Sequence, residues 1–228
     1  MPLRSWSDMP KGMHNDEVLY YYRRLLRKKS ELKIKFAADK ILAAILLLIF
    51  AIPMCVVAVM IKLDSPGPVF FRQKRITAYG KIFRIHKFRT MVSDADKRGS
   101  SVTVKGDSRI TRVGQFIRKY RIDELPQLID VLEGNMSFVG TRPEVPEYVK
   151  KYTKPMRATL LLPAGITSRA SIEYKDEADI LDGVDDPDRI YIEKILPEKM
   201  KYNLESIESF SLIEDVKVML DTVAAVLH

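Results

Sequence analysis

Two adjacent carboxylates, Asp123 and Glu124, lie between arginines in this sequence. Arg118 and Arg121 precede the pair, and Arg142 follows it. The planar guanidinium group of arginine matches the geometry of a phosphate group through paired hydrogen bonds. A carboxylate beside a bound phosphate can attack phosphorus, as in enzymes that form an aspartyl phosphate, when Mg²⁺ shields the charge. The residue types and their spacing therefore point to phosphoryl-transfer chemistry.

The segment after the two carboxylates predicts a helix. Apolar side chains recur there at helical spacing and a glycine follows them, at Leu125, Leu128, Ile129, Leu132 and Gly134. In such a helix Asp123 is the N-cap and Glu124 lies in the first turn, where the helix dipole favours a negative charge. A helix N-terminus also suits phosphate. Capping alone would explain both acids, but the surrounding arginines favour a site.

Three motifs resemble the bacterial sugar transferases, the monotopic phosphoglycosyl transferases that begin glycan assembly on a polyprenyl phosphate. They are residues 87–91 (KFRTM), 123–128 (DELPQL) and 136–144 (MSFVGTRPE), and the likeness extends from about Lys35 to the C-terminus. The resemblance implies transfer of a sugar-1-phosphate from a UDP-sugar to polyprenyl (undecaprenyl) phosphate, with release of UMP. It also implies roles for single residues: Asp123 as the nucleophile that forms a phosphosugar intermediate, Glu124 as a ligand of Mg²⁺, and Lys87, Arg118 and Arg142 as phosphate-binding cations.

The same resemblance implies an enzyme of capsule, exopolysaccharide, O-antigen or glycoprotein assembly at the bacterial inner membrane. Its partners are then the two substrates and membrane lipid, and not nucleic acid. A homodimer is compatible with the resemblance. The competing hypothesis is a non-catalytic basic protein that attaches to the membrane and binds lipid or nucleic acid through charge. It accounts for the net charge of +8 and the pI near 9.4. It does not account for the two carboxylates, which repel phosphate in the absence of a metal ion.

The composition fits one globular core and a membrane element. The chain has 228 residues, of which 46% are hydrophobic and 30% charged, which is enough for one core but hardly for two large ones. The single cysteine, Cys55, excludes an intramolecular disulfide framework, and the three histidines are too scattered to predict a zinc site. Residues 1–15 are polar and carry no secretory signal, so we expect the catalytic part on the cytoplasmic side.

An uncharged segment, residues 41–61, is long enough to span a bilayer at about 1.5 Å per residue. Pro53 lies in its middle, where it removes a backbone hydrogen bond. Basic residues flank both ends, whereas the positive-inside rule gives a spanning helix one basic flank. We therefore expect a re-entrant helix-break-helix hairpin within one leaflet, and a Pro-kinked span is the alternative. Family members often have Ser-Pro at the break, where this chain has Ile52-Pro53.

The segments on either side of the apolar run complete the expected fold. Residues 18–35 mix basic with apolar side chains, which predicts an amphipathic helix on the membrane surface or an ordinary solvated helix. After the membrane segment, residues 69–75 and 81–88 predict a hairpin whose end turns Lys87 and Arg89 toward the site.

The remaining segments are expected to alternate between helices and loops. The expectations are a mobile loop over 94–107, a helix over 110–121 that delivers Arg118, a solvated acidic loop over 173–188, and a last amphipathic helix that begins with a capping box at 211–214. The apolar face of that last helix is core or rests on the membrane. The predicted fold is therefore α+β and mainly helical, with a basic lead-in (1–35), a re-entrant membrane helix (36–63) and a cytoplasmic catalytic domain (64–228).

Overall fold

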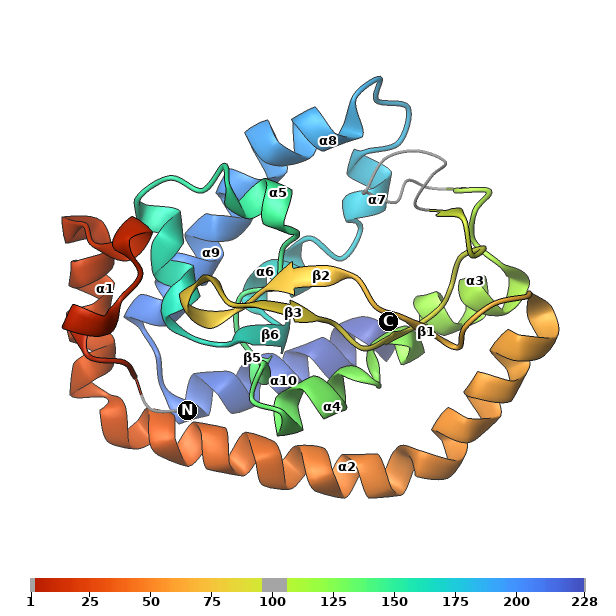
Figure 1. Ribbon diagram of the computed structural model, residues 1–228, viewed down its shortest axis with the longest axis horizontal. Helices are drawn as coiled ribbons and strands as arrows, with labels where there is room; N and C mark the ends of the chain where they lie inside the picture. The colour runs from red at the N-terminus through yellow and green to blue at the C-terminus, as the bar shows by residue number, and fades with distance from the viewer. Residues whose placement is uncertain (1–2, 96–105, 228) are drawn as a thin grey trace.

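The computed structural model describes residues 3–95 and 106–227, and within them the chain is mainly helical with three two-stranded sheets (Figure 1). The mainly helical α+β class expected from the sequence is confirmed. Most of the loop expected over 94–107 lies outside the described residues.

Two helices, not one, occupy the basic lead-in. After the 3₁₀ turns η1 (Trp6–Asp8) and η2 (Lys11–Met13), helix α1 (Asp16–Arg27) begins at Asn15, whose side-chain oxygen accepts a hydrogen bond of 3.0 Å from the Val18 N–H. Helix α2 (Lys29–Asp64) starts almost at once, so the expected border at 35/36 falls inside α2.

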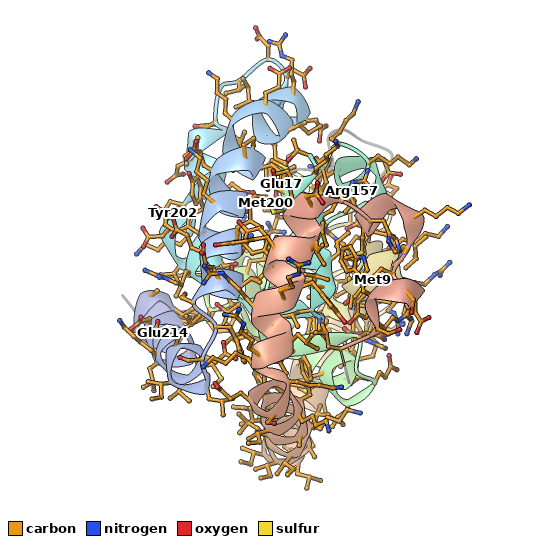
Figure 2. The ribbon with its side chains drawn as sticks, turned by 90° about the vertical axis from the view of Figure 1, so that its left-hand side faces the viewer. Met9, Glu17, Arg157, Met200, Tyr202 and Glu214 are labelled. Carbon is orange, nitrogen blue, oxygen red and sulfur yellow. The ribbon has the colours of Figure 1, made fainter. Side chains whose placement is uncertain are left out.

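The apolar side of α1 faces the protein. Val18, Tyr22 and Leu25 are buried in a core shared with the 3₁₀ helix η6 (Pro155–Leu161) and with the start of α2. Helix α9 (Leu196–Glu208) packs beside α1, and Figure 2 shows the two lying next to each other. The apolar side of α1 is therefore protein core, and only its basic side remains for lipid headgroups.

Helix α2 is continuous through Pro53 and carries exposed apolar side chains. In the second half of the helix the axis turns away from its first direction (Figure 1), as expected where a proline removes a backbone hydrogen bond. Within the described residues α2 is the one helix long and apolar enough to cross a membrane. Only 6% of its most apolar stretch of 18 residues is buried. Its most exposed apolar side chains are Leu48, Ile52 and Leu63.

The expected hairpin is confirmed and consists of two short ladders. Strand β2 (Lys74–Ile76) pairs antiparallel with β3 (Ile82–Arg84) across the turn η3 (Ala78–Gly80). Further from the turn, β1 (Phe70–Phe71) pairs antiparallel with β4 (Lys87–Phe88). The rings of Phe70 and Phe88 stack at 5.5 Å, which holds the second ladder together.

The middle of the chain supplies the elements that carry the site. They are α3 (Arg112–Lys119), the 3₁₀ turn η5 (Ile122–Glu124), α4 (Gln127–Leu132), β5 (Met136–Val139), α5 (Pro146–Val149) and β6 (Ala164–Thr167). Strand β5 runs parallel to β6, and the backbones of Gly140 and Gly165 approach so closely that neither leaves room for a side chain. Gly114 in α3 likewise lies against the carbonyl group of Thr90. Helix α4 packs on α2, which ties the site to the long apolar helix.

The C-terminal third is a series of helices. They are α6 (Arg169–Glu173), α7 (Glu177–Ile180), α8 (Pro187–Ile190), the π-helical turn η7 (Tyr191–Ile195), α9 and α10 (Leu212–Leu227). The acidic segment expected as a loop thus contains α7 and the start of α8, and Asp186 caps α8 through a 3.0 Å hydrogen bond from the Arg189 N–H. Ser211 caps α10, as expected, and the apolar side chains Ile213, Val216, Leu220 and Val223 remain exposed along it.

Candidate active site

The carboxylates of Asp123 and Glu124 lie in the 3₁₀ turn η5 and are buried, with 5% and 8% of their surfaces exposed. The expectation that Asp123 caps a helix is wrong. The turn is closed by a hydrogen bond from the Glu124 N–H to the Arg121 carbonyl, and α4 begins only after Pro126, a residue that favours the start of a helix. The carboxylates therefore precede α4 and do not lie within it.

Arg121 enters this turn with a left-handed backbone, at φ +52°. Such a conformation is uncommon for a residue with a side chain and costs conformational energy. Here it reverses the chain between α3 and η5. Consequently Arg121 lies beside the carboxylates, with its Nη1 atom 3.9 Å from Oε2 of Glu124.

Two more cations from distant parts of the sequence contact the pair. The Nζ atom of Lys87, at the start of β4, is 2.9 Å from Oδ2 of Asp123 and 3.3 Å from Oε1 of Glu124. The Nη2 atom of Arg142, just after β5, donates a hydrogen bond of 2.9 Å to Oε1 of Glu124. Lys87, Asp123, Glu124 and Arg142 are thus brought together as the sequence indicates, while their chemical roles remain predictions.

Burial raises the pKa of the Glu124 carboxyl, but Arg142, Lys87 and Arg121 outweigh burial and hold that pKa far below its usual value. Glu124 in turn raises the pKa of the Arg142 guanidinium. The Glu124 carboxyl is therefore fully ionised at neutral pH. An ionised glutamate surrounded by cations provides a fixed negative charge at this position.

Arg118 and Arg89 have different surroundings from those of Lys87. Arg118 lines the same cavity and donates a 3.4 Å hydrogen bond to the Thr90 hydroxyl, without an ion pair to either carboxylate among the described residues. Arg89 lines the cavity as well, as expected from its place at the end of the hairpin. Its guanidinium also donates to the carbonyl groups of Ser65 and Pro66, so it holds the turn after α2.

The site opens into a cavity of about 920 Å³ with a strongly basic lining. Besides Asp123, its wall includes Arg72, Arg75, Lys87, Arg109, Arg118, Arg121, Arg142, Lys175 and Lys199. At the far side Tyr191 donates a 2.5 Å hydrogen bond to Glu144, and Lys199 pairs with Glu177 at 2.6 Å. Burial, and next the Glu144 carboxylate, raise the pKa of the Tyr191 hydroxyl well above its usual value, so it stays a donor.

Sequence reasoning did not single out Arg75, Tyr191 or Lys199 as part of this cavity. They come from β2, η7 and α9, which are far apart in the sequence. Each has the local pattern of an ordinary structural residue. Glu144, which accepts the hydrogen bond from Tyr191, is the last residue of the motif at 136–144. It could therefore have been found from the sequence.

The donor set fits Mg²⁺. This ion is usually held by one or two carboxylates together with substrate phosphates and water. Among the described residues no hydrogen bond reaches Oε2 of Glu124, so this hard oxygen is open to a metal ion. Glu124 is therefore suited to hold Mg²⁺ when a phosphate group enters the cavity.

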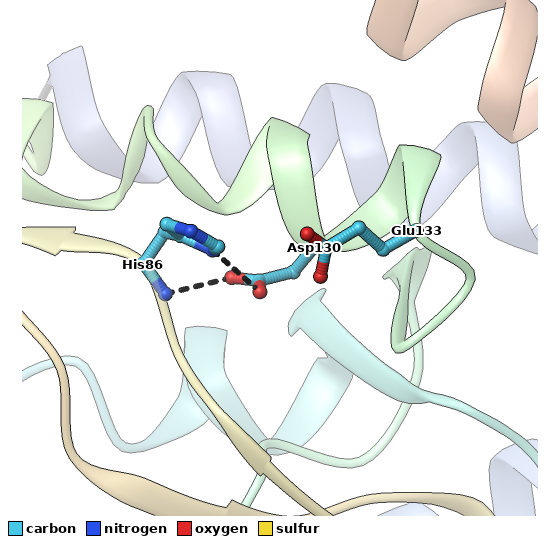
Figure 3. A group of neighbouring side chains, drawn as sticks. All are labelled: His86, Asp130 and Glu133. Atoms are coloured by element: carbon cyan, nitrogen blue, oxygen red, sulfur yellow. Dashed lines mark hydrogen bonds and ion pairs between the residues drawn. The ribbon is translucent and has the colours of Figure 1, made fainter.

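A second group of possible metal ligands, His86, Asp130 and Glu133, lies where the chain between β3 and β4 meets α4 (Figure 3). The His86 N–H and the Nδ1 atom each lie 2.8 Å from the Asp130 carboxylate, and its Nε2 atom contacts the Arg72 guanidinium. Both ring nitrogens are thus engaged, which leaves no lone pair for a metal. The buried His86 and Asp130 instead fasten the hairpin to α4, and α4 follows the turn that carries Asp123 and Glu124.

Comparison with known proteins gives matches over the part of the chain that contains these site residues. A family model described as bacterial sugar transferase matches residues 30–228. A UDP-N-acetylgalactosamine-undecaprenyl-phosphate N-acetylgalactosaminephosphotransferase of Aeromonas hydrophila is 37% identical over 197 residues, which are 85% of this chain and 44% of that protein. A UDP-glucose:undecaprenyl-phosphate glucose-1-phosphate transferase of Escherichia coli is 36% identical, over 83% of this chain and 39% of the relative. The chain spans less than half the length of these two proteins.

A further relative is closer to this chain in length. The UDP-glucose:undecaprenyl-phosphate glucose-1-phosphate transferase of Caulobacter vibrioides is 34% identical over 205 residues, which are 85% of this chain and 69% of that protein.

Proposed function

Because the chain belongs to the bacterial sugar transferase family, we propose that it transfers a sugar-1-phosphate from a UDP-sugar to undecaprenyl phosphate and releases UMP. One observation carries the proposal: the buried acids Asp123 and Glu124 lie side by side among cations, with Asp123 in the wall of a large cavity that is also lined by many lysines and arginines. The names of the relatives supply the two substrates, and the cavity supplies cations for their phosphate groups.

The proposed chemistry has two steps. An oxygen of the Asp123 carboxylate attacks the phosphorus that bears the sugar, and the bond from that phosphorus to the UMP oxygen breaks with its electron pair. The acceptor phosphate then attacks the same phosphorus, and the Asp123 carboxylate leaves. The product is a polyprenyl diphosphate sugar, and the enzyme returns to its first state. Oδ2 of Asp123 is paired with Lys87, which leaves Oδ1 as the attacking oxygen.

The cations around the pair have separate roles in this proposal. Lys87 and Arg142 neutralise the phosphate oxygens that approach the two carboxylates, and Arg118 binds the outer phosphate of the donor. Glu124, with the substrate phosphates, would hold Mg²⁺, which shields the negative charge between nucleophile and phosphate. The cost of bringing an anion to a carboxylate is thereby reduced.

The proposal includes a membrane position for α2. Residues before α2 and residues after it share one core, because Val18, Tyr22 and Leu25 of α1 are buried with Leu161 of η6. A helix that crossed the bilayer would place these partners on opposite sides. We infer a re-entrant α2 that enters one leaflet and returns, with the catalytic region on the cytoplasmic face.

The alternative, a non-catalytic basic protein on the membrane, explains the net charge and the exposed apolar helices. It gives no reason for a buried acid pair beside a basic cavity. The test is a panel of UDP-sugars with undecaprenyl phosphate and Mg²⁺, in which UMP release is measured. UMP release from at least one UDP-sugar that also requires undecaprenyl phosphate and Mg²⁺ supports the proposed reaction. The absence of release with every sugar, from protein that is folded and binds UDP, would overturn the proposed reaction.

A further inference from the structure

A second cavity, of about 200 Å³, adjoins the candidate active site and has a different character. Its walls are apolar side chains of the membrane helix α2, of α4 and of the two strands β5 and β6. They include Leu46, Phe50, Leu128, Phe138 and Ile166. Helix α10 closes one side with Ala225 and Val226. We name this cavity the apolar groove.

The two threonine hydroxyl groups in the wall of the apolar groove are already hydrogen-bonded. The Thr222 hydroxyl lies 2.7 Å from the Thr167 hydroxyl and 2.7 Å from the Val218 carbonyl oxygen. The groove therefore offers an occupant little except apolar contact, and a hydrocarbon is the matching ligand.

One end of the apolar groove is charged, and it meets the basic cavity there. Arg121, Ser171 and Lys175 line both cavities, and Glu124 lines the groove at the same end. Lys175 is exposed and makes no ion pair with another described residue. Two cations and a hydroxyl at the mouth of an apolar groove suit a ligand with a phosphate head and a hydrocarbon tail.

We propose that the apolar groove binds the first isoprene units of the polyprenyl phosphate acceptor, with its phosphate between Arg121 and Lys175. This inference rests on the proposed function and adds the place of the acceptor. An apolar cavity of roughly 150 Å³ accepts benzene, and an isoprene unit is slightly smaller, so the groove holds the beginning of the chain. The rest of the chain continues along α2 and α10, whose exposed apolar side chains lie next to the groove residues.

The placement agrees with the two successive steps. The nucleotide sugar occupies the basic cavity first, and after UMP has left, the acceptor phosphate reaches the same phosphorus from the groove, at Arg121. Arg121 lies at the junction of the two cavities. The acceptor oxygen thus enters opposite the Asp123 oxygen, at the position that the UMP oxygen has vacated.

The test fills the groove and leaves the basic cavity intact. Ala225→Phe adds a ring within the groove, and Ala224→Phe, one residue earlier on the exposed side of α10, is the matched control. The probe is a farnesyl phosphate with a photoreactive group at its far end, used with the full chain in detergent micelles. UDP affinity is measured on the same samples by calorimetry.

The expected result is a photo-crosslink to peptides of α2 or α10 in the parent protein. We expect Ala225→Phe to weaken farnesyl phosphate binding by about tenfold or more while UDP affinity stays within about twofold, and Ala224→Phe to change neither. Equal binding by Ala225→Phe and Ala224→Phe, or a crosslink far from both helices, would overturn the inference. So would competition by phosphatidylglycerol as strong as that by undecaprenyl phosphate, because the occupant would then be a membrane lipid.

A failure of the proposed function gives a different pattern. If the parent protein binds farnesyl phosphate in the groove but no UDP-sugar yields UMP, the acceptor site is supported and the proposed reaction is wrong. If UMP is released in the presence of the acceptor and Ala225→Phe has no effect on acceptor binding, the reaction is supported and the proposed acceptor site is wrong.

Discussion

The ammonium group of Lys87 lies 2.9 Å from the carboxylate of Asp123, although 36 positions separate the two residues in the sequence. The same ammonium is 3.3 Å from Glu124, so a single cation from β4 contacts both acids of η5. Two carboxylates side by side repel each other, and the shared cation reduces that repulsion. The hairpin therefore supplies part of the positive charge that surrounds the two carboxylates.

Replacing Asp123 with asparagine should abolish the reaction and preserve the fold. The amide keeps the shape of the side chain but cannot act as an anionic nucleophile. We expect UMP release to fall by roughly 10⁴-fold or more, with UDP affinity retained in calorimetry. Asp16→Asn, at an exposed position in the first turn of α1, is the control and should be fully active. Appreciable turnover by Asp123→Asn would exclude a covalent intermediate on this residue.

Glu124→Gln should remove the response to Mg²⁺. A neutral amide is a poor ligand for a hard dication, so we expect a loss of activity at least as large as the roughly 10–100-fold that outer ligand partners cost. The check is a titration of UMP release against Mg²⁺, beside the exposed control Glu205→Gln. A titration curve and rate like those of the parent would remove Glu124 from the metal site.

The ionisation of Glu124 should also appear in the pH dependence of stability. Burial raises the pKa of its carboxyl, but Arg142, Lys87 and Arg121 hold that pKa in the folded protein well below the ordinary value of 4.5. The folded state then binds fewer protons than the unfolded state below about pH 5, so this contribution is complete above that pH and is lost on acidification. We expect the parent to be more stable than Glu124→Gln at about pH 7, and this difference in Tm to shrink toward about pH 3. A difference that stays constant over that range would contradict the cation-paired state of Glu124.

Arg142→Lys tests whether the guanidinium fork is needed. A lysine keeps the positive charge but presents a point charge instead of a planar pair of donors. We expect kcat/KM for the UDP-sugar to fall by about tenfold to a hundredfold, which is about 1.4–2.7 kcal/mol. Arg27→Lys, at the exposed end of α1, is the control. Unchanged donor affinity and rate in Arg142→Lys would mean that this residue serves packing only.

The sequence predicted the parts of the site that depend on local order. Asp123, Glu124 and Arg142 stand in short motifs, and the hairpin that carries Lys87 follows from alternating apolar residues. The start of α4 was misplaced, since the left-handed backbone of Arg121 depends on the packing between α3 and η5 and leaves no pattern in the sequence. The far side of the cavity could not be predicted, because Tyr191 and Lys199 meet Glu144 and Glu177 only after the chain has folded.

The basic lead-in, residues 1–35, is another segment whose surroundings could not be predicted from local sequence. Its mixture of basic and apolar side chains is equally consistent with a membrane surface and with a protein core. The partners that decide between them, in η6 and α9, lie more than a hundred positions away. Only tertiary structure could assign Val18, Tyr22 and Leu25 to the core.

That packing changes what is expected of Pro53→Leu. From the sequence alone, this substitution restores a backbone donor and favours a straight spanning helix by about 3 kcal/mol. Spanning would carry α1 across the bilayer and expose Val18, Tyr22 and Leu25, each of which loses roughly 1.5–3 kcal/mol. Their sum, about 5 kcal/mol or more, exceeds the gain in α2. We therefore expect Pro53→Leu alone to keep its N-terminus on the cytoplasmic face.

Cysteine labelling in intact cells can check this balance. Single cysteines are placed at the exposed positions Ser5 and Ser93, in a chain with Cys55 replaced by alanine, and treated with an impermeant thiol reagent. Both should be shielded with Pro53 and equally with Pro53→Leu. When Leu25→Asp is added to Pro53→Leu, α1 loses its place in the core, and Ser5→Cys should become reactive in part of the population while Ser93→Cys stays shielded. Leu25→Asp with Pro53 retained is the control and should leave Ser5→Cys shielded. Labelling of Ser5→Cys in the chain that keeps both Pro53 and Leu25 would mean that α2 spans the bilayer, because no re-entrant helix can place that residue outside the cell.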